Sequence, residues 1–286
     1  MTELVRLSKL MSQRGLCSRR EADKLIEHGL VKVNGERVNT LGIKFASDVK
    51  IELTQRAQAI QKERVTIMIN KPVGYVSGQA EDNYIPAVRL ITKQTQSEHD
   101  QTAYKLQGAH FNGLAPAGRL DIDSQGLLVL TQDGRIAKQL IGQDSDIEKE
   151  YLVRVDGDIS EEQIATLCFG LSLDGKPLKR AKVRQLNPEQ LQFILREGKK
   201  RQIRRMCEAV NLKVTGLKRV RVGELRLGKL AEGQWRFVLA EEFRHRDSGK
   251  RDSLKKSAKP EMRSGRTLYG KAKDHGKTKH GNDGRK

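Results

Sequence analysis

The sequence has few of the residues that mark secreted, membrane or metal-binding proteins. Its three cysteines, Cys17, Cys168 and Cys207, are too widely spaced for a disulfide framework or a zinc site. The six histidines form no ligand pattern, so we expect no bound metal. No apolar run reaches about 18 residues, and Met1–Leu10 carries three charges where a signal peptide requires apolar residues. These absences exclude a membrane span and favour a cytoplasmic protein.

Aromatic residues and negative charge are also scarce. Aromatics make up 4% of the 286 residues. The chain has 36 Asp+Glu and 55 Lys+Arg, so its net charge is +19. Such an excess favours a polyanionic partner, and nucleic acid is the usual one. Residues 244–286 alone hold 15 Lys/Arg and 5 Asp/Glu with few large apolar side chains. We expect a disordered basic tail that contacts RNA; the alternative is a solubilising terminus.

The first 64 residues predict a small module followed by a linker. Helix-spaced apolar residues precede Ser18-Arg19-Arg20-Glu21, which has the pattern of a capping box at the start of a second helix. Asn34-Gly35 joins two short alternating runs, which is the signal of a β-hairpin, and residues 49–53 predict another strand. Residues 55–64 are polar and predict a linker.

The region from residue 65 onward predicts a mixed α+β domain. Ser160 is a predicted helix N-cap, and a further helix is expected over Arg201–Val210. Helices and strands do not alternate regularly, which argues against a doubly wound parallel fold. Strands are expected over residues 65–69, 126–130, 151–155 and 191–195.

The N-terminal module resembles the S4 RNA-binding domain over residues 4–54. The resemblance rests on Arg6-Leu7-Ser8-Lys9, Cys17-Ser18-Arg19-Arg20-Glu21-Ala22 and Val31-Lys32-Val33-Asn34-Gly35. Basic side chains beside a helix start can hold phosphates, although they can also form an ordinary solvated face. The residues expected to bind RNA here are Arg6, Lys9, Ser18, Arg19 and Arg20.

Asp121 is the candidate for chemistry from the residues alone. It lies two positions after Arg119 and shortly before a buried strand, which predicts a carboxylate in a loop at the edge of a sheet. A nearby cation favours the ionised form, and an ionised carboxylate suits a nucleophile or an electrostatic stabiliser. A structural salt bridge is the alternative. Tyr151 is a candidate for stacking, with a strand residue packed in the core as its alternative.

Four motifs in order resemble the RsuA-type pseudouridine synthases, which join an S4 domain to a catalytic α+β domain. The motifs are Asn70-Lys71-Pro72-Val73-Gly74, residues 118–128, Glu148-Lys149-Glu150-Tyr151-Leu152-Val153 and residues 197–206. The resemblance covers residues 4–240. It implies a catalytic domain over 65–243 with a largely antiparallel sheet.

The resemblance also implies roles for individual residues in a cofactor-free isomerisation of uridine in RNA. Asp121 would be the catalytic carboxylate, either attacking C1′ or deprotonating the sugar. Tyr151 would pack on the uracil and handle a proton, and Arg204 would pair with Asp121. The residues implied to bind the substrate nucleotide are Gly118, Arg119, Ile203 and Lys71. Those expected to contact phosphate are Lys200, Arg201 and Arg205.

The implied partner is ribosomal RNA, most closely 23S rRNA, in a ribosomal subunit or its assembly intermediate, with the enzyme acting as a monomer. Three alternatives stay open: a 16S rRNA target, a non-catalytic S4-type assembly factor, and a phosphodiesterase. Residues 78–112 are polar and poorly periodic, and could form an RNA-contacting loop near the pocket.

Overall fold

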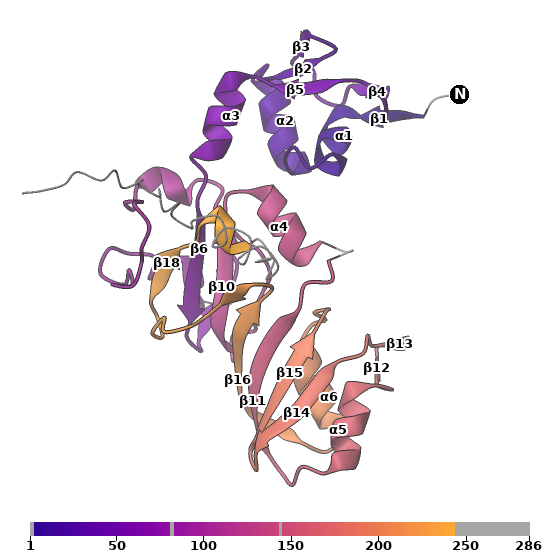
Figure 1. The fold of residues 1–286 in the computed structure, drawn as a ribbon, viewed down its shortest axis with the longest axis vertical. Coiled ribbons are helices and arrows are strands. Elements are labelled where there is room, and N and C mark those ends of the chain that lie inside the picture. The colour runs from indigo at the N-terminus through magenta and orange to yellow at the C-terminus, as the bar shows by residue number, and fades with distance from the viewer. Residues whose placement is uncertain (1–2, 81–82, 143–144, 244–286) are drawn as a thin grey trace, which may run out of the picture. The chain divides into compact units, whose positions relative to one another are not determined.

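The computed structural model describes residues 3–80, 83–142 and 145–243, so the predicted tail lies outside the described residues (Figure 1). The N-terminal part combines two short helices with small sheets, as the S4 resemblance implied. Its elements are β1 (Leu4–Arg6), α1 (Leu7–Gln13), α2 (Arg19–Glu27), β2 (Val31–Val33), β3 (Glu36–Val38), β4 (Lys44–Ala46), β5 (Ile51–Leu53) and α3 (Gln55–Lys62).

Local chemistry explains how these elements begin and turn. The capping box is confirmed, because the Glu21 amide donates to the Ser18 hydroxyl at 3.3 Å and the Glu21 carboxylate accepts from the Ser18 amide at 2.9 Å. The hairpin is confirmed as well: Asn34 and Gly35 have φ of 49° and 89°, as a two-residue turn of this hand requires. The apolar sides of α1 and α2 pack on β2 to form one core.

The predicted linker contains a helix. The Thr54 hydroxyl accepts from the Ala57 amide at 3.3 Å and so caps α3, while Ala57 is fully buried. Polar composition hid this helix, since one buried alanine carries its apolar side. The boundaries of the domains themselves remain a prediction.

The second part is a mixed α+β domain around a nine-stranded sheet, which confirms the expected fold class. Its strand order is β14-β15-β11-β16-β10-β6-β18, with β17 on β16 and β9 on β10; β10 and β16 are parallel and the other pairs antiparallel. Two further two-stranded sheets pair β7 with β8 and β12 with β13. The strands of the whole second part are β6 (Thr66–Lys71), β7 (Tyr75–Val76), β8 (Ile85–Pro86), β9 (Ala115–Pro116), β10 (Gln125–Thr131), β11 (Lys149–Asp156), β12 (Ser172–Leu173), β13 (Lys176–Pro177), β14 (Lys182–Asn187), β15 (Gln190–Leu195), β16 (Lys213–Val222), β17 (Leu225–Arg226) and β18 (Trp235–Phe237).

Helices cover both faces of the sheet. The helices are α4 (Gly134–Ile141), α5 (Glu161–Cys168) and α6 (Gln202–Glu208), with 3₁₀ turns at Ala87–Leu90, Gly108–Phe111 and Ala240–Phe243. Alternate side chains of β6 and β10 enter separate cores: Ile67 and Leu128 belong to the core that includes residues of α5 and α6, and Met68 and Leu127 to the core that includes Leu140 of α4. Central strands buried on both faces read as continuous apolar runs, which is why they were predicted well.

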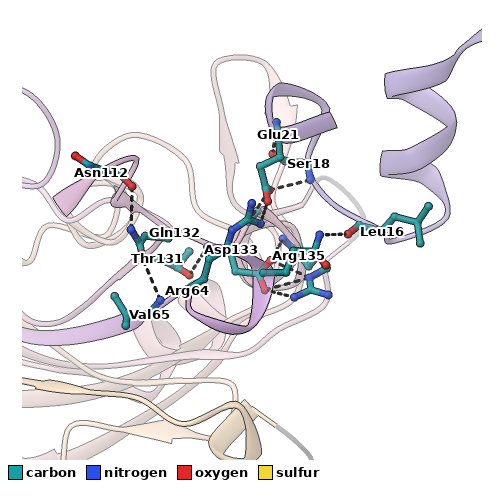
Figure 2. Close-up of polar contacts among 12 residues, drawn as sticks. Leu16, Ser18, Glu21, Arg64, Val65, Asn112, Thr131, Gln132, Asp133 and Arg135 are labelled. Carbon is teal, nitrogen blue, oxygen red and sulfur yellow. Dashed lines mark hydrogen bonds and ion pairs between the residues drawn. The ribbon is translucent and has the colours of Figure 1, made fainter. Parts of the chain in front are cut away.

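A polar seam links α2 to the start of α4 (Figure 2). One carboxylate oxygen of Glu21 accepts from the amide of Gly134 at 3.0 Å as well as from the Ser18 amide, and the other oxygen is paired with Arg64. Asp133 caps α4 by accepting from the Arg135 amide at 2.9 Å. The Glu21 carboxylate therefore accepts backbone N–H groups at the starts of two helices, α2 and α4.

None of the helices within the described ranges is long and apolar enough to cross a membrane.

Candidate active site

A cleft of about 880 Å³ opens beside the loop that precedes β10. This loop, residues 117–124, is called the aspartate loop below. Further lining residues come from the end of α4, the start of β11, β16 and the turn that leads from β15 into α6. Nine Lys/Arg and two Asp/Glu line the cleft, which gives it the charge that a polyanion requires. The predicted site residues that line it are Gly118, Arg119, Asp121, Tyr151, Lys200, Arg201, Ile203 and Arg204.

The aspartate loop is held on both sides of Asp121 by the segment that follows β6. The buried Ser77 hydroxyl donates to the carbonyl of Leu120 at 2.6 Å and accepts from the Leu120 amide at 2.8 Å. The Gly74 amide donates to the carbonyl of Ile122 at 2.8 Å. The backbone of the residues before and after Asp121 is therefore anchored to a single upstream segment.

Arg219 of β16 holds the base of the same loop. Its buried guanidinium donates to the carbonyl of Arg119 at 3.2 Å and to that of Leu127 at 2.8 Å. Gly126 has a φ of 106°, and a Cβ at this position would lie 2.3 Å from the carbonyl oxygen of Arg219. Only glycine fits where β10 and β16 approach this closely.

Arg204 binds the aspartate loop through a different carboxylate from the predicted one. Instead of pairing with Asp121, its Nε lies 3.2 Å from Asp123 Oδ2, and its Nη2 donates to the Asp123 carbonyl at 2.8 Å. Arg201 also donates to Asp123 Oδ2, at 3.0 Å. Burial alone would raise the pKa of Asp123, but the hydrogen bond from Arg201 and the charge of Arg204 lower it below its ordinary value. Two cations on Asp123 leave Asp121 facing the cleft.

Tyr151 and Ile203 supply the apolar part of the cleft. Tyr151 of β11 is 8% exposed and belongs to the core, and it also lines the cleft, so its stacking role stays a prediction. Ile203 is likewise buried at the edge of the cleft. The predicted apolar face is confirmed for Ile203, Met206 and Cys207 of α6; Val210 is buried too, but it lies after the helix, which ends at Glu208.

Lys71 lies beneath the aspartate loop. Its side chain has no exposed surface, and its Nζ donates to the carbonyls of Pro72 at 2.7 Å and Tyr75 at 2.8 Å. Burial lowers the pKa of Lys71 to about 8, against the opposing charges of Asp123 and Asp121. In this position the ammonium fixes the turn that carries Gly74, and it does not line the cleft.

The remaining predicted residues lie elsewhere. Arg205 forms two hydrogen bonds to Asp174, at 3.0 and 2.7 Å. Ser18 uses its hydroxyl as the cap of α2, whereas Arg6, Arg19 and Arg20 are exposed and Lys9 is half-buried. The described residues between 78 and 112 pack on β18 and do not line the cleft: the Trp235 indole donates to the Thr92 carbonyl at 2.7 Å.

Sequence reasoning missed Ser77, Arg219, Asp123 and Lys149. Lys149 lines the cleft, and burial, followed by the charges of Arg219 and Lys179, lowers its pKa. Asp123 lies within the motif of residues 118–128, and Lys149 lies two residues before Tyr151. Both could have been found as charged residues that flank Asp121 and Tyr151 in the sequence. Ser77 gives no such signal.

The buried Cys17 and Cys207 are unsuited to chemistry. All three cysteines are free, and burial raises the pKa of Cys17 to about 11 and that of Cys207 to about 12. The cleft instead presents the Asp121 carboxylate among cations and beside Tyr151, which makes Asp121 the candidate for chemistry. Fold and site together define an enzyme that acts on a nucleotide of a polyanionic chain.

Comparison with known proteins identifies the class. The chain matches the family model for RNA pseudouridylate synthase over residues 65–209 and that for the S4 domain over residues 5–45. It belongs to the RNA pseudouridine synthase family, whose members are isomerases, and it carries the S4 domain at its N-terminal end.

Two relatives and one solved structure show the extent of the similarity. The chain is 37% identical over 243 residues to the dual-specificity RNA pseudouridine synthase RluF of Escherichia coli K12, covering 84% of this chain and 77% of the relative. It is 32% identical to the ribosomal large subunit pseudouridine synthase B of Bacillus subtilis, covering 84% and 94%. A crystal structure of a pseudouridylate synthase, 28% identical, superimposes with a TM-score of 0.57 and covers 84% of this chain and 98% of its own.

Proposed function

We propose that this enzyme converts uridine to pseudouridine at a defined position of ribosomal RNA, with 23S rRNA as its target. The observation that carries the proposal is the presence of Asp121, Tyr151 and Arg204 on one strongly cationic cleft. A non-catalytic RNA-binding factor would have no need to bring these three side chains together. The relatives named for the large subunit and for dual specificity support the substrate class.

The substrate nucleotide must leave the RNA stack to react. Within a helix, C1′ and C5 of uridine are hidden, so the base is extruded into the cleft and held between apolar and aromatic side chains. Tyr151 and Ile203 line the cleft where the uracil would pack. The cations that also line the cleft, including Arg119 and Lys149, would hold the ribose and the flanking phosphates.

The reaction rearranges one bond and needs no oxidant or cofactor. The bond from C1′ to N1 breaks, the base turns over, and C5 bonds to C1′; N1 gains a proton and the C5 proton leaves. Asp121 acts at the sugar, either by attacking C1′ or by removing a sugar proton. Both routes require a carboxylate fixed beside the ribose, and the anchoring of the backbone on both sides of Asp121 supports this role. The Tyr151 phenol, which lines the cleft, would handle the C5 proton.

The S4 domain supplies a second contact with RNA. The exposed Arg6, Arg19 and Arg20, with Lys9, would bind phosphates of folded RNA in a ribosomal subunit or its assembly intermediate. The proposal places the enzyme in the cytoplasm and acting as a monomer.

Tritium release from C5-labelled uridine tests this function directly. Unmodified 23S and 16S transcripts are compared, with the wild type and Asp121→Asn side by side. Release from 23S RNA by the wild type, abolished in Asp121→Asn while RNA affinity is retained, is the expected result. Release by Asp121→Asn at the normal rate would refute the role of Asp121, and release from 16S RNA alone would refute the target.

A further inference from the structure

An aromatic and a cationic side chain form an exposed stack outside the cleft. Phe169 follows α5 and is 58% exposed. The guanidinium carbon of Arg180 lies 4.2 Å from the centroid of the Phe169 ring. A large apolar ring at this exposure is unfavourable in water, and a guanidinium on one face of it leaves flat surfaces open to a further planar group.

The backbone holds this pair rigidly. The Ala181 amide donates to the carbonyl of Cys168 at 2.9 Å, which sets the chain before Phe169 beside the chain after Arg180. A second bond runs from the Leu178 amide to the carbonyl of Leu171 at 2.9 Å, and Leu178 is part of the core. The stack is therefore presented by a fixed scaffold rather than by a loose loop.

The pair adjoins the cleft along the chain. Lys179, the residue before Arg180, lines the cleft, and its amide donates to the Glu197 carboxylate at 3.0 Å. An RNA strand whose target nucleotide occupies the cleft extends beyond it on either side. The segment carrying Arg180 begins at the cleft wall, within reach of such a strand.

Within the part of the chain that the structure describes, the guanidinium of Arg180 contacts the Phe169 ring but forms no ion pair. Its neighbours are paired: Lys179 lies 3.3 Å from Asp146, and Lys182 lies 3.1 Å from Glu148. No carboxylate of the described residues forms an ion pair with Arg180. An unpaired guanidinium stacked on an exposed ring suits a nucleotide, which offers both a π-face and a phosphate.

We propose that the Phe169–Arg180 pair is a stacking platform for a second, unflipped nucleotide of the substrate RNA. The platform contributes to RNA binding and leaves the chemical step to the cleft. This inference rests on the proposed function, since it takes the polyanion in the cleft to be RNA. It goes beyond that function by assigning a binding subsite outside the cleft.

The test measures binding of a single-stranded RNA that contains 2-aminopurine, a base whose fluorescence is quenched by stacking. The variants are Phe169→Ala, Phe169→Trp and Arg180→Ala. Phe111→Ala and Arg184→Ala are matched controls, because both residues are exposed and neither belongs to the site or to the pair. Phe169 is exposed, so thermal unfolding of its variants should match the wild type.

Loss of one stacked base should raise the dissociation constant of Phe169→Ala about 10-fold. Phe169→Trp should restore the affinity, and the salt dependence of Phe169→Ala should stay unchanged, since no phosphate contact is removed. On ribosomal transcripts, KM should rise while kcat stays at the wild-type value. Unchanged affinity in Phe169→Ala, or an equal loss in Phe111→Ala, would overturn the platform.

The binding measurement also separates the two proposals. If the wild type isomerises none of the ribosomal transcripts, the proposed function fails, while the effect of Phe169→Ala on oligonucleotide binding still decides the platform. If turnover is normal and Phe169→Ala binds as the wild type does, the platform alone fails.

Discussion

Removal of the Ser77 hydroxyl should show how far catalysis depends on the anchoring of the aspartate loop. In Ser77→Ala, the amide and the carbonyl of Leu120 both lose their partner at a site where Ser77 is 3% and Leu120 7% exposed. A buried polar group left unpaired costs about 1–3 kcal/mol, so two such groups predict a loss of about 2–6 kcal/mol in the free energy of unfolding.

The same change should slow the reaction. Leu120 directly precedes Asp121, and a carboxylate displaced by about 1 Å can cost on the order of 100-fold in rate. We expect kcat in Ser77→Ala to fall by about 10- to 100-fold with a smaller change in KM, because the rest of the cleft is untouched. Single-turnover tritium release at saturating RNA gives kcat, and urea unfolding gives the stability.

A matched variant separates anchoring from general destabilisation. Ser97 is also buried, at 4% exposure, and its hydroxyl accepts from the His99 amide at 3.2 Å, away from the cleft. Ser97→Ala should lose stability but keep kcat, and Ser77→Thr, which keeps the hydroxyl, should recover most of the rate. The reasoning fails if Ser77→Ala loses stability yet turns over as fast as Ser97→Ala.

Three further variants test the same neighbourhood. Burial lowers the pKa of Lys71 from 10.5 to about 8, so between these two pH values the unfolded chain binds more protons than the folded chain. In urea titrations, the stability of the wild type relative to Lys71→Met should therefore rise from pH 8 to pH 10.5. A stability difference that does not change with pH would count against a buried ammonium. Since the pKa of Asp123 is lowered in the fold, the advantage of the wild type over Asp123→Asn should be full above about pH 4 and disappear on further acidification, as followed by thermal unfolding. Gly126→Ala should cost about 3 kcal/mol or more, because its Cβ meets backbone atoms of Arg219; a smaller loss on chemical denaturation would show that the strands can separate.

Features set by neighbouring residues were predictable from the sequence. The capping box at Ser18 and the hairpin at Asn34 depend on contacts within a few residues, and the central strand β10 is a continuous apolar run. The helix α3 was missed because its apolar signal is a single buried alanine. Local pattern therefore recovered the fold class and seven of the eighteen described strands, and it missed the long β16.

The geometry of the cleft was only partly predictable. The motifs pointed to Asp121, Tyr151 and Arg204, and the structure brings all three to one cleft. Arg204 contacts Asp123 and not Asp121, and the choice between these two carboxylates depends on how the domain packs. No spacing of residues in the sequence predicts it. Ser77 was invisible for the same reason: its partner is 43 residues away, and a serine in a polar stretch carries no periodicity.

The anchoring of the aspartate loop also dictates when the enzyme becomes active as it is made. The loop is closed from Ser77, 43 residues upstream of its partner, and from Arg219, 100 residues downstream of Arg119. Contacts this distant form late, because their loop-closure entropy must be offset by the rest of the fold. A nascent chain that lacks β16 already contains Asp121, but it lacks Arg219, which anchors the aspartate loop. Competence to break a glycosidic bond should therefore arise only after nearly the whole catalytic domain has left the ribosome.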